Sequence, residues 1–423
     1  MTDIRNNLTR RKVLIGAGAA AAAVSFPMPA IAQSGALKLG FVHPETGPLG
    51  AVAAGDKFVL NHLKQQLSDG IVVDGGRKRA VEIIVKDSQS SSNRASEVAA
   101  ELILNDEVDM MVAGIHPLTV SPVADQCELN GVPLVSTITP WETQYYGRGA
   151  TDEKPFDWQL HLFWGFSEIT NTYMDIWNQL DTNKVVGGLW PNNPDGIGFA
   201  QGFTPVLKSN GYTVVDPGRY QDLTDDFSAI IAQFKEAGVE IITGVALPPD
   251  WTTFWTQAAQ QGFNVKAATT AAALAFPGTA ESLGPLAQNH SFDLFWHPSY
   301  PFESSISGES ATDYAKAFEA VENAQWIQPI GTIHMIFETA IDVLKRSGGG
   351  DYDATREALF STDIQTISGP VKAGSGPVKN AVLTPLTGAQ WRQSDGPHAF
   401  EPIIVSTVAA KNVPAGGKVE SVS

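Results

Sequence analysis

The sequence alternates between short apolar segments and amphipathic segments, and this rhythm runs along the chain twice. In the first run, the apolar segments 37–42, 81–85, 110–113 and 132–135 have the length and composition of buried strands. Apolar residues at helical spacing between them predict helices over 59–67, 95–103 and 119–130. Repeated strand–helix units build a parallel sheet with helices on both faces, so the pattern restricts this part of the chain to an α/β fold.

The rhythm restarts after a connecting region, 141–166, which is rich in aromatic residues and has no regular periodicity. Strands are predicted at 184–189, 212–215 and 240–245, with helices at 197–209, 227–234 and 251–261. Further helices are predicted at 312–323, 329–346 and 353–361, and late strands at 388–392 and 402–405. Because a single core rarely grows beyond about 250–300 residues, two separate runs in 423 residues indicate two α/β lobes.

The N-terminus has the pattern of an export signal. Arg10 and Arg11 precede an apolar stretch that ends at Val24, and Ala30-Ile31-Ala32 forms a small-residue cleavage site. This pattern is typical of twin-arginine signals, which carry folded proteins across the bacterial inner membrane. We therefore expect residues 1–32 to be a signal peptide, cleaved after Ala32, and the mature protein to be periplasmic. No later segment is continuously apolar enough to predict a membrane span.

The chain is acidic, with 45 acidic and 28 basic residues and a net charge of −17. Removal of residues 1–32 would take away four basic residues and one acidic residue, which makes the mature charge −20. Such a surface repels phosphate backbones, so nucleic-acid binding is not expected.

Sequence motifs of common α/β enzymes are absent. The chain has no G-x-S-x-G nucleophile elbow, no Walker A loop, no H-E-x-x-H and no cysteine cluster. The single cysteine, Cys127, has apolar residues at helical spacing around it and is predicted to be a buried, unreactive thiol. We expect no catalytic activity, no metal and no cofactor.

An ordered set of segments resembles the branched-chain-amino-acid-type periplasmic binding proteins, the substrate-binding proteins of ABC importers. The resemblance covers essentially residues 36–410 and rests on LKLGFVHPETGPLG, VKDSQSSSNRASEVAAELI, DMMVAGIHPLTVSPVADQCELNGVPLVS, WPNNPDGIGFAQGF, EIITGVALPPDWTTFWTQAAQQGF and GAQWR. It implies a type I periplasmic-binding-protein fold: two doubly wound parallel-sheet lobes joined by three crossovers. By this resemblance the N-terminal lobe takes residues 36–157 and 298–378, and the C-terminal lobe takes 158–297 and 379–423.

The resemblance also implies a mechanism and partners. The two lobes close on a small carboxylate or amino-acid-like ligand by a hinge movement, and the closed protein, expected to be a monomer, docks on ABC permease subunits in the inner membrane. In the family, loops matching 116–119 and 136–141 hold the ligand carboxylate through hydroxyls and backbone amides, and the loop matching 190–196 faces them. The candidate ligand-binding residues are His116, Thr119, Ser136, Thr137, Thr139, Trp141, Trp190, Asp195, Asp250 and Tyr300.

Each candidate also has an ordinary structural interpretation. Serine and threonine at strand ends often cap helices, and Asp195 followed by Gly196 is a common turn pair. A single histidine such as His116 is often only a polar loop residue, and most aromatic side chains pack in cores.

Two departures from the family pattern bear on the ligand. Asp195 stands where relatives that bind amino acids usually have an aromatic residue, and the loop 269–273, which usually supplies the acid for the ammonium group, has none. A buried cation without a partner is costly, so the sequence predicts a carboxylate ligand that lacks a free α-amino group, and the nearby tryptophans would suit an aromatic one. The alternative is that Asp195 or Asp250 has taken over the ammonium group.

Two other functions stay open on the sequence. A ligand-sensing receptor of the same fold would share all these features, and an exported α/β hydrolase could draw catalytic carboxylates from anywhere in the chain.

Overall fold

The computed structural model describes residues 35–422, so the expected signal peptide lies outside the described residues. The first sheet is entirely parallel, in the strand order β17-β7-β6-β5-β1-β4. Its strands are β1 (Leu37–His43), β4 (Val81–Asp87), β5 (Met110–Ala113), β6 (Leu134–Ser136), β7 (Gln159–Leu162) and β17 (Ala381–Val382).

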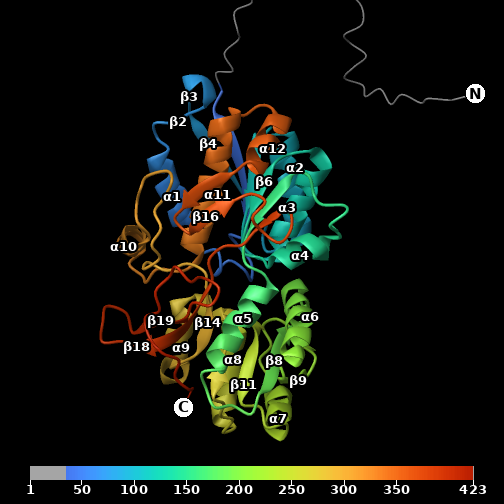
Figure 1. The fold of residues 1–423 in the computed structure, drawn as a ribbon, viewed down its shortest axis with the longest axis vertical. Coiled ribbons are helices and arrows are strands. Elements are labelled where there is room, and N and C mark those ends of the chain that lie inside the picture. Colours follow the sequence, from blue (N-terminus) through green and yellow to red (C-terminus); the bar gives the residue numbers. More distant parts are fainter. Residues whose placement is uncertain (1–34, 423) are drawn as a thin grey trace, which may run out of the picture. The chain divides into compact units, whose positions relative to one another are not determined.

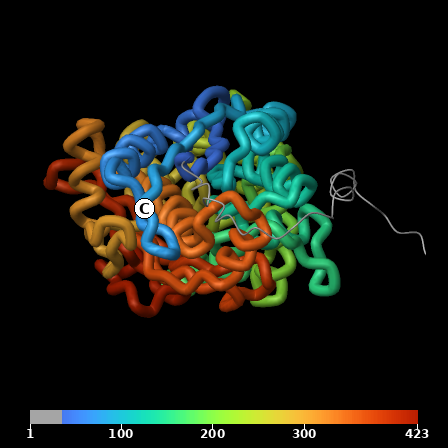
Figure 2. The backbone as a smooth tube through the Cα atoms, turned by 90° about the horizontal axis from the view of Figure 1, so that it is seen from above, coloured from blue at the N-terminus to red at the C-terminus, as the bar shows by residue number. Residues whose placement is uncertain are grey.

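Helices cover both faces of the first sheet, because its strands alternate apolar side chains between two cores. Phe41 and Val112 face α1 (Asp56–Gln66) and α11 (Pro329–Ser347), whereas Val42 and Met111 face α2 (Ser92–Leu104) and α3 (Pro117–Asn130). Although α1 and α11 are far apart in sequence, they pack side by side, as the neighbouring blue and orange segments of Figures 1 and 2 show.

The second sheet is also parallel, with β8 and β11 at its centre. Its strands are β8 (Val185–Pro191), β9 (Thr213–Val215), β10 (Arg219–Tyr220), β11 (Ile241–Ala246), β12 (Ala267–Ala268) and β13 (Ala271–Ala272). One face packs on α5 (Phe166–Trp177) and α6 (Pro194–Ser209), and the other on α7 (Ser228–Glu236) and α8 (Pro248–Gln260). Two parallel sheets with helices on both faces confirm the expected α/β fold.

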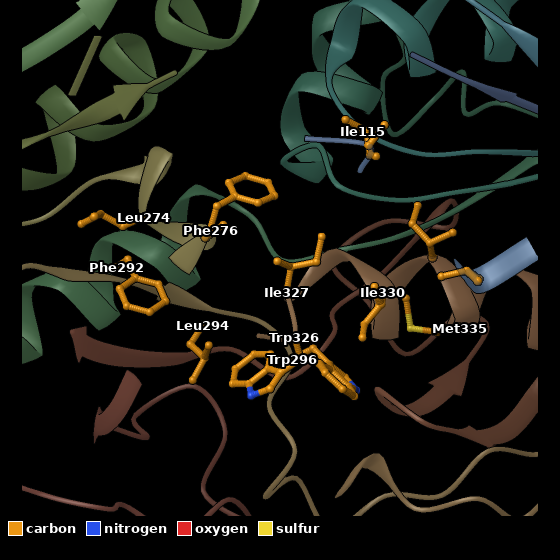
Figure 3. Close-up of a cluster of buried hydrophobic side chains, with 14 of the residues drawn as sticks. Ile115, Leu274, Phe276, Phe292, Leu294, Trp296, Trp326, Ile327, Ile330 and Met335 are labelled. Atoms are coloured by element: carbon orange, nitrogen blue, oxygen red, sulfur yellow. The ribbon is translucent and has the colours of Figure 1, made fainter. Parts of the chain in front are cut away.

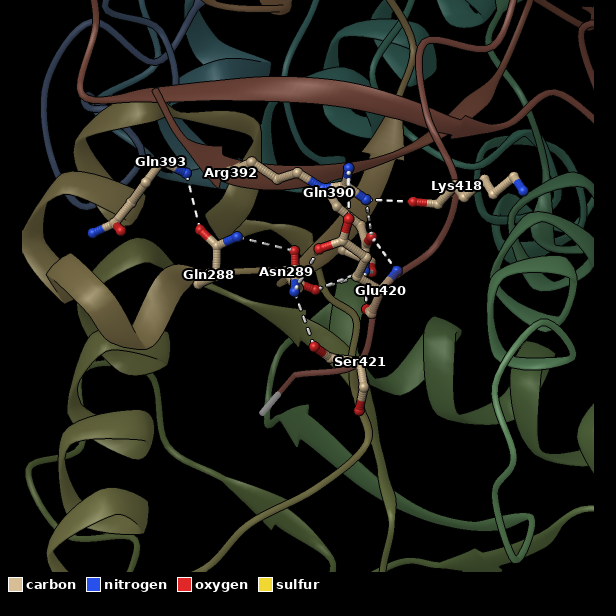
Figure 4. Close-up of polar contacts among 9 residues, drawn as sticks. Gln288, Asn289, Gln390, Arg392, Gln393, Lys418, Glu420 and Ser421 are labelled. Atoms are coloured by element: carbon tan, nitrogen blue, oxygen red, sulfur yellow. Dashed lines mark hydrogen bonds and ion pairs between the residues drawn. The ribbon is translucent and has the colours of Figure 1, made fainter. Parts of the chain in front are cut away.

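A third, antiparallel sheet joins β14 (Ser291–Leu294), β18 (Thr387–Gln393) and β19 (Phe400–Ser406). The C-terminal segment is fastened to it. The side-chain amide of Gln390 donates to the carbonyl of Glu420 and accepts from its backbone N–H, and the Asn289 side chain donates to the carbonyl of Ser421 at 2.9 Å (Figure 4).

The remaining elements are short or peripheral. They are β2 (Ile71–Val72), β3 (Lys78–Arg79), α4 (Trp141–Tyr145), α9 (Pro277–Leu283), α10 (Ala311–Glu322), α12 (Tyr352–Phe360), β15 (Asp363–Thr366) and β16 (Gly369–Lys372). Within residues 35–422, no helix is both long enough and apolar enough to cross a membrane.

We call the first sheet with its helices the first lobe, and the second and third sheets with their helices the second lobe. The chain passes between the lobes three times: after β7, after β14 and between β17 and β18. Figure 3 shows the second passage, where Trp296 and Trp326 pack edge to face, with 5.7 Å between ring centroids.

Strand pairing corrects the expected lobe boundaries. β7 pairs with β6, and β17 pairs with β7, so residues 159–162 and 381–382 belong to the first sheet although both were expected in the second lobe. β7 lies in the aromatic-rich region 141–166, and its four residues are too few to stand out there as a strand.

Candidate ligand-binding site

A pocket lies where the carboxyl ends of the two parallel sheets meet. Its walls come from loops that follow β1, β5, β6 and β7 in the first lobe, and β8, β11 and β13 in the second lobe. Open parallel sheets bind ligands at this edge, because loops and helix N-termini there present groups that the sheet does not use. The empty space of this pocket, with the open solvent at its mouth included, is about 750 Å³.

The first-lobe wall contains strained backbone. Ile115, His116 and Ile138 have φ values of 70°, 71° and 55°, and the amide of His116 donates to the carbonyl of Ile138 at 3.1 Å. Branched residues rarely adopt positive φ, and such strain concentrates at functional sites. Both isoleucine side chains line the pocket, and Ile115 lies across it from Phe276 of the second lobe (Figure 3).

Two of the predicted hydroxyls connect neighbouring strands within the first sheet. The Ser136 hydroxyl bonds Nδ1 of His161 at 2.9 Å, and Thr137 donates to the carbonyl of Leu162 at 2.7 Å. Both partners lie on β7, so these side chains join β6 to β7. Neither residue lines the pocket.

The other two hydroxyls are also used inside the first lobe. Thr119 shares a hydrogen bond of 3.1 Å with Ser88, and Thr139 donates to the carbonyl of Ile138 at 2.9 Å. Both side chains are fully buried outside the pocket. The sequence placed them at the correct strand ends, but their rotamers turn the hydroxyls towards the protein.

The predicted aromatic residues pack in cores because large rings gain most from complete burial. Trp190 is fully buried against Phe203, with 5.8 Å between ring centroids, and Trp141 packs beside Tyr146. Tyr300 donates to the carbonyl of Leu294 at 2.7 Å. None of the three predicted rings lines the pocket.

Asp250 lies in the first turn of α8, buried and outside the pocket. Burial, together with the nearby charge of Asp222, raises the pKa of Asp250 to about 7. Of the two acids that the sequence proposed for an ammonium group, Asp195 lines the pocket and Asp250 does not.

His116 and Asp195 are the predicted residues that do line the pocket. The Nδ1 atom of His116 accepts from the amide of Leu118 at 3.2 Å, and burial lowers the His116 pKa to about 4, so the ring is neutral near pH 7. Asp195 is half-buried in the first turn of α6. Burial, together with the nearby charge of Asp222, raises the pKa of Asp195 to about 7.

A second carboxyl group, Asp293 of β14, also lines the pocket. It was not among the ligand-binding residues predicted from the sequence. Asp293 is almost fully buried, and the Tyr173 hydroxyl donates to its Oδ1 at 2.8 Å. Burial, together with the nearby charge of Asp195, raises the Asp293 pKa to about 7. The apolar alternation of Phe292, Leu294 and Trp296 was the signal that could have identified this strand.

Aromatic side chains form much of the remaining wall: Phe163, Trp164, Phe199, Phe276 and Phe295. Trp164 is buried, and within residues 35–422 its indole N–H has no hydrogen-bond partner. No group of three or more metal-binding side chains is placed to hold an ion in this same part of the chain. The site is therefore an apolar, aromatic pocket with two carboxyl groups.

Comparison with known proteins agrees with this architecture. A sequence profile described as "Periplasmic binding protein" matches residues 36–397. The structure is similar to that of the leucine-binding protein LivK of Thermotoga maritima, with a TM-score of 0.70 and 18% identity, covering 87% of this chain and 98% of that one.

Two further solved structures are similar at the same level. LivJ of Streptococcus pneumoniae, in complex with isoleucine, has a TM-score of 0.69 and 16% identity, covering 87% of this chain and 99% of that one. A Rhodopseudomonas palustris solute-binding protein in complex with 4-hydroxybenzoate has a TM-score of 0.70 and 16% identity, covering 89% of this chain and 99% of that one. At these identities the likeness establishes the fold.

Proposed function

The chain belongs to the periplasmic binding protein family, and we propose that it is the extracytoplasmic solute-binding protein of an ABC importer. The single observation that carries this proposal is the pocket whose walls come from both lobes at the carboxyl ends of their strands. The similar proteins of known structure include ABC transporter solute-binding proteins, which supports the role.

The proposed mechanism is hinge closure about the three chain passages. The ligand binds to one lobe first, and the other lobe then closes over it. The closed form is favoured because only there do both lobes contact the ligand. The closed monomer then delivers the ligand to permease subunits in the inner membrane.

For the ligand, we propose a small molecule of amino-acid-like size. The sequence predicted a carboxylate ligand without an amino group, and this prediction rested on the lack of an acid in loop 269–273. Asp293 supplies a pocket acid from a different element, which removes the reason to exclude an amino group.

A combined binding and scattering experiment tests the proposal. Mature protein would be screened by thermal shift against amino acids, amines, amides and carboxylates, and X-ray scattering would follow each hit. We expect at least one compound to raise the melting temperature and to reduce the radius of gyration, because a ligand of the native state stabilises it. Conversion of a bound compound into a product would contradict the proposal, as would stabilisation without closure.

A further inference from the structure

The first lobe offers the pocket few groups for an anion. The four hydroxyls expected there are turned to Ser88, His161 and the carbonyls of Leu162 and Ile138. At the start of α3, the amide of Leu118 is bonded to Nδ1 of His116, and those of Thr119 and Val120 to the carbonyl of His116. The helix N-terminus that would otherwise attract a carboxylate is thus satisfied internally.

The charge of the pocket also disfavours an anionic ligand. Among the described residues that line it, no lysine or arginine is found, and the ionisable side chains are Asp195, Asp293 and His116. His116 is neutral near pH 7. Neutral N–H groups of His116 and Trp164 can meet an uncharged acceptor such as a hydroxyl, but they do not balance a buried carboxylate beside two acids.

The aromatic wall also suits a cation. The rings of Phe163, Trp164 and Phe199, with those of Phe276 and Phe295, surround the same space as the two carboxyl groups. Aromatic faces attract ammonium groups and also bury the apolar part of a ligand.

We propose that the ligand is an apolar primary amine without a carboxylate, with its ammonium group held by Asp195 and Asp293 of the second lobe. This inference rests on the proposed solute-binding function and names its substrate class. It reverses the ligand expected from sequence: the anchored group is the amino group, and the carboxylate is absent.

The proposal sets the direction of the pH dependence. An aliphatic ammonium keeps its proton between pH 6 and pH 8, whereas both carboxyl groups lose theirs near pH 7. The groups that act on them are Asp222 beside Asp195, the Tyr173 hydroxyl on Asp293, the two acids on each other, and neutral His116 across the pocket. Amine affinity should therefore rise from pH 6 to pH 8, by about tenfold for each carboxyl group that must lose its proton to bind the ammonium group.

Calorimetry on the mature protein tests the proposal with three compounds of one skeleton: 2-phenylethylamine, phenylalanine and 3-phenylpropanoate. We expect the amine to bind at least tenfold more tightly than either of the others. Asp195→Asn and Asp293→Asn should each weaken amine binding at least tenfold. Asp181→Asn, which removes an exposed charge from the second lobe, should leave it unchanged. Melting temperatures of the variants show that each is folded.

The outcomes separate this inference from the proposed function. Tighter binding of phenylalanine or 3-phenylpropanoate, with lobe closure, would overturn the amine inference and leave the importer function standing. Amine binding that is unaffected by both asparagine variants, or that weakens as pH rises, would also overturn it. If the amine and the wider solute panel all fail to bind, the inference and the solute-binding function both fail.

Discussion

At the scale of single residues, His161 of β7 connects the first sheet to the pocket wall. Its Nε2–H donates to the carbonyl of Thr139 at 2.6 Å, and its Nδ1 accepts from Ser136 at 2.9 Å, so both ring nitrogens are used in the neutral form. Burial lowers the His161 pKa to about 4 from an ordinary value of 6.5. A charged imidazole at this buried position would lack the solvation that water gives it in the unfolded chain.

This residue should make the protein less stable in mild acid. Since the unfolded chain binds a proton at His161 below pH 6.5 and the folded chain only near pH 4, stability is full above pH 6.5 and falls through this window. The contribution is on the order of 3 kcal/mol. Urea unfolding at pH 7 and pH 4.5 should show a smaller pH difference in unfolding free energy for His161→Gln than for wild type. An equal difference in the two proteins would contradict this account.

At the scale of elements, α11 carries a glycine that accommodates the second passage between the lobes. A Cβ at Gly331 would lie 2.2 Å from Cδ1 of Trp296, whose indole N–H donates to the carbonyl of Ile367. The contact therefore fixes the chain leaving β14 against α11.

We expect Gly331→Ala to lower the unfolding free energy by about 1–3 kcal/mol, because the methyl group displaces a buried tryptophan. Gly278→Ala is a matched control in α9, where no atom lies within 4 Å of the added Cβ, and it should be neutral or stabilising by up to about 1 kcal/mol. Denaturant unfolding measures both, and similar effects of the two substitutions would show that Trp296 does not set the cost.

The C-terminal segment depends on β18. The buried Gln390 donates to the carbonyls of Asn289 and Glu420 at 2.9 and 2.8 Å, and accepts from the amide of Glu420 at 2.9 Å (Figure 4). Gln390→Ala should cost about 1–3 kcal/mol, since it leaves buried backbone groups unpaired. The exposed side chain of Gln393 on the same strand provides the control, and Gln393→Ala should change stability by less than about 0.5 kcal/mol. Proteolysis that starts in 418–423 of Gln390→Ala alone would support the role, and equal resistance of the two variants would count against it.

At the scale of the whole molecule, the proposed function requires export before the protein meets its ligand. We expect the periplasmic protein to begin at Gln33, after cleavage at Ala32, and the double substitution Arg10→Lys and Arg11→Lys to stop export. N-terminal sequencing and cell fractionation measure both effects. Wild-type protein that stays in the cytoplasm with an intact Met1 would refute the expected signal.

Much of the architecture follows from local pattern. Strands β1, β5 and β11 and the helix α11 lie within a residue or two of their expected bounds, because each has a clear apolar period and defined ends. β7 and β14 were missed because each is only four residues long, so the alternation of polar and apolar residues within it is too short to stand out from the neighbouring aromatic residues.

The sequence by itself determined two parallel-sheet lobes and the loops at which a ligand should bind, because strand and helix periods and strand ends are local properties. Only the tertiary structure decided which side chains reach the pocket. Thr139 and Trp190 stand at the expected strand ends, yet one turns to a backbone carbonyl and the other packs into the core. Asp293 enters the pocket from β14, whose pairing with β18 joins residues almost a hundred positions apart. Side-chain direction at a site depends on such long-range packing, and a local sequence pattern does not contain it.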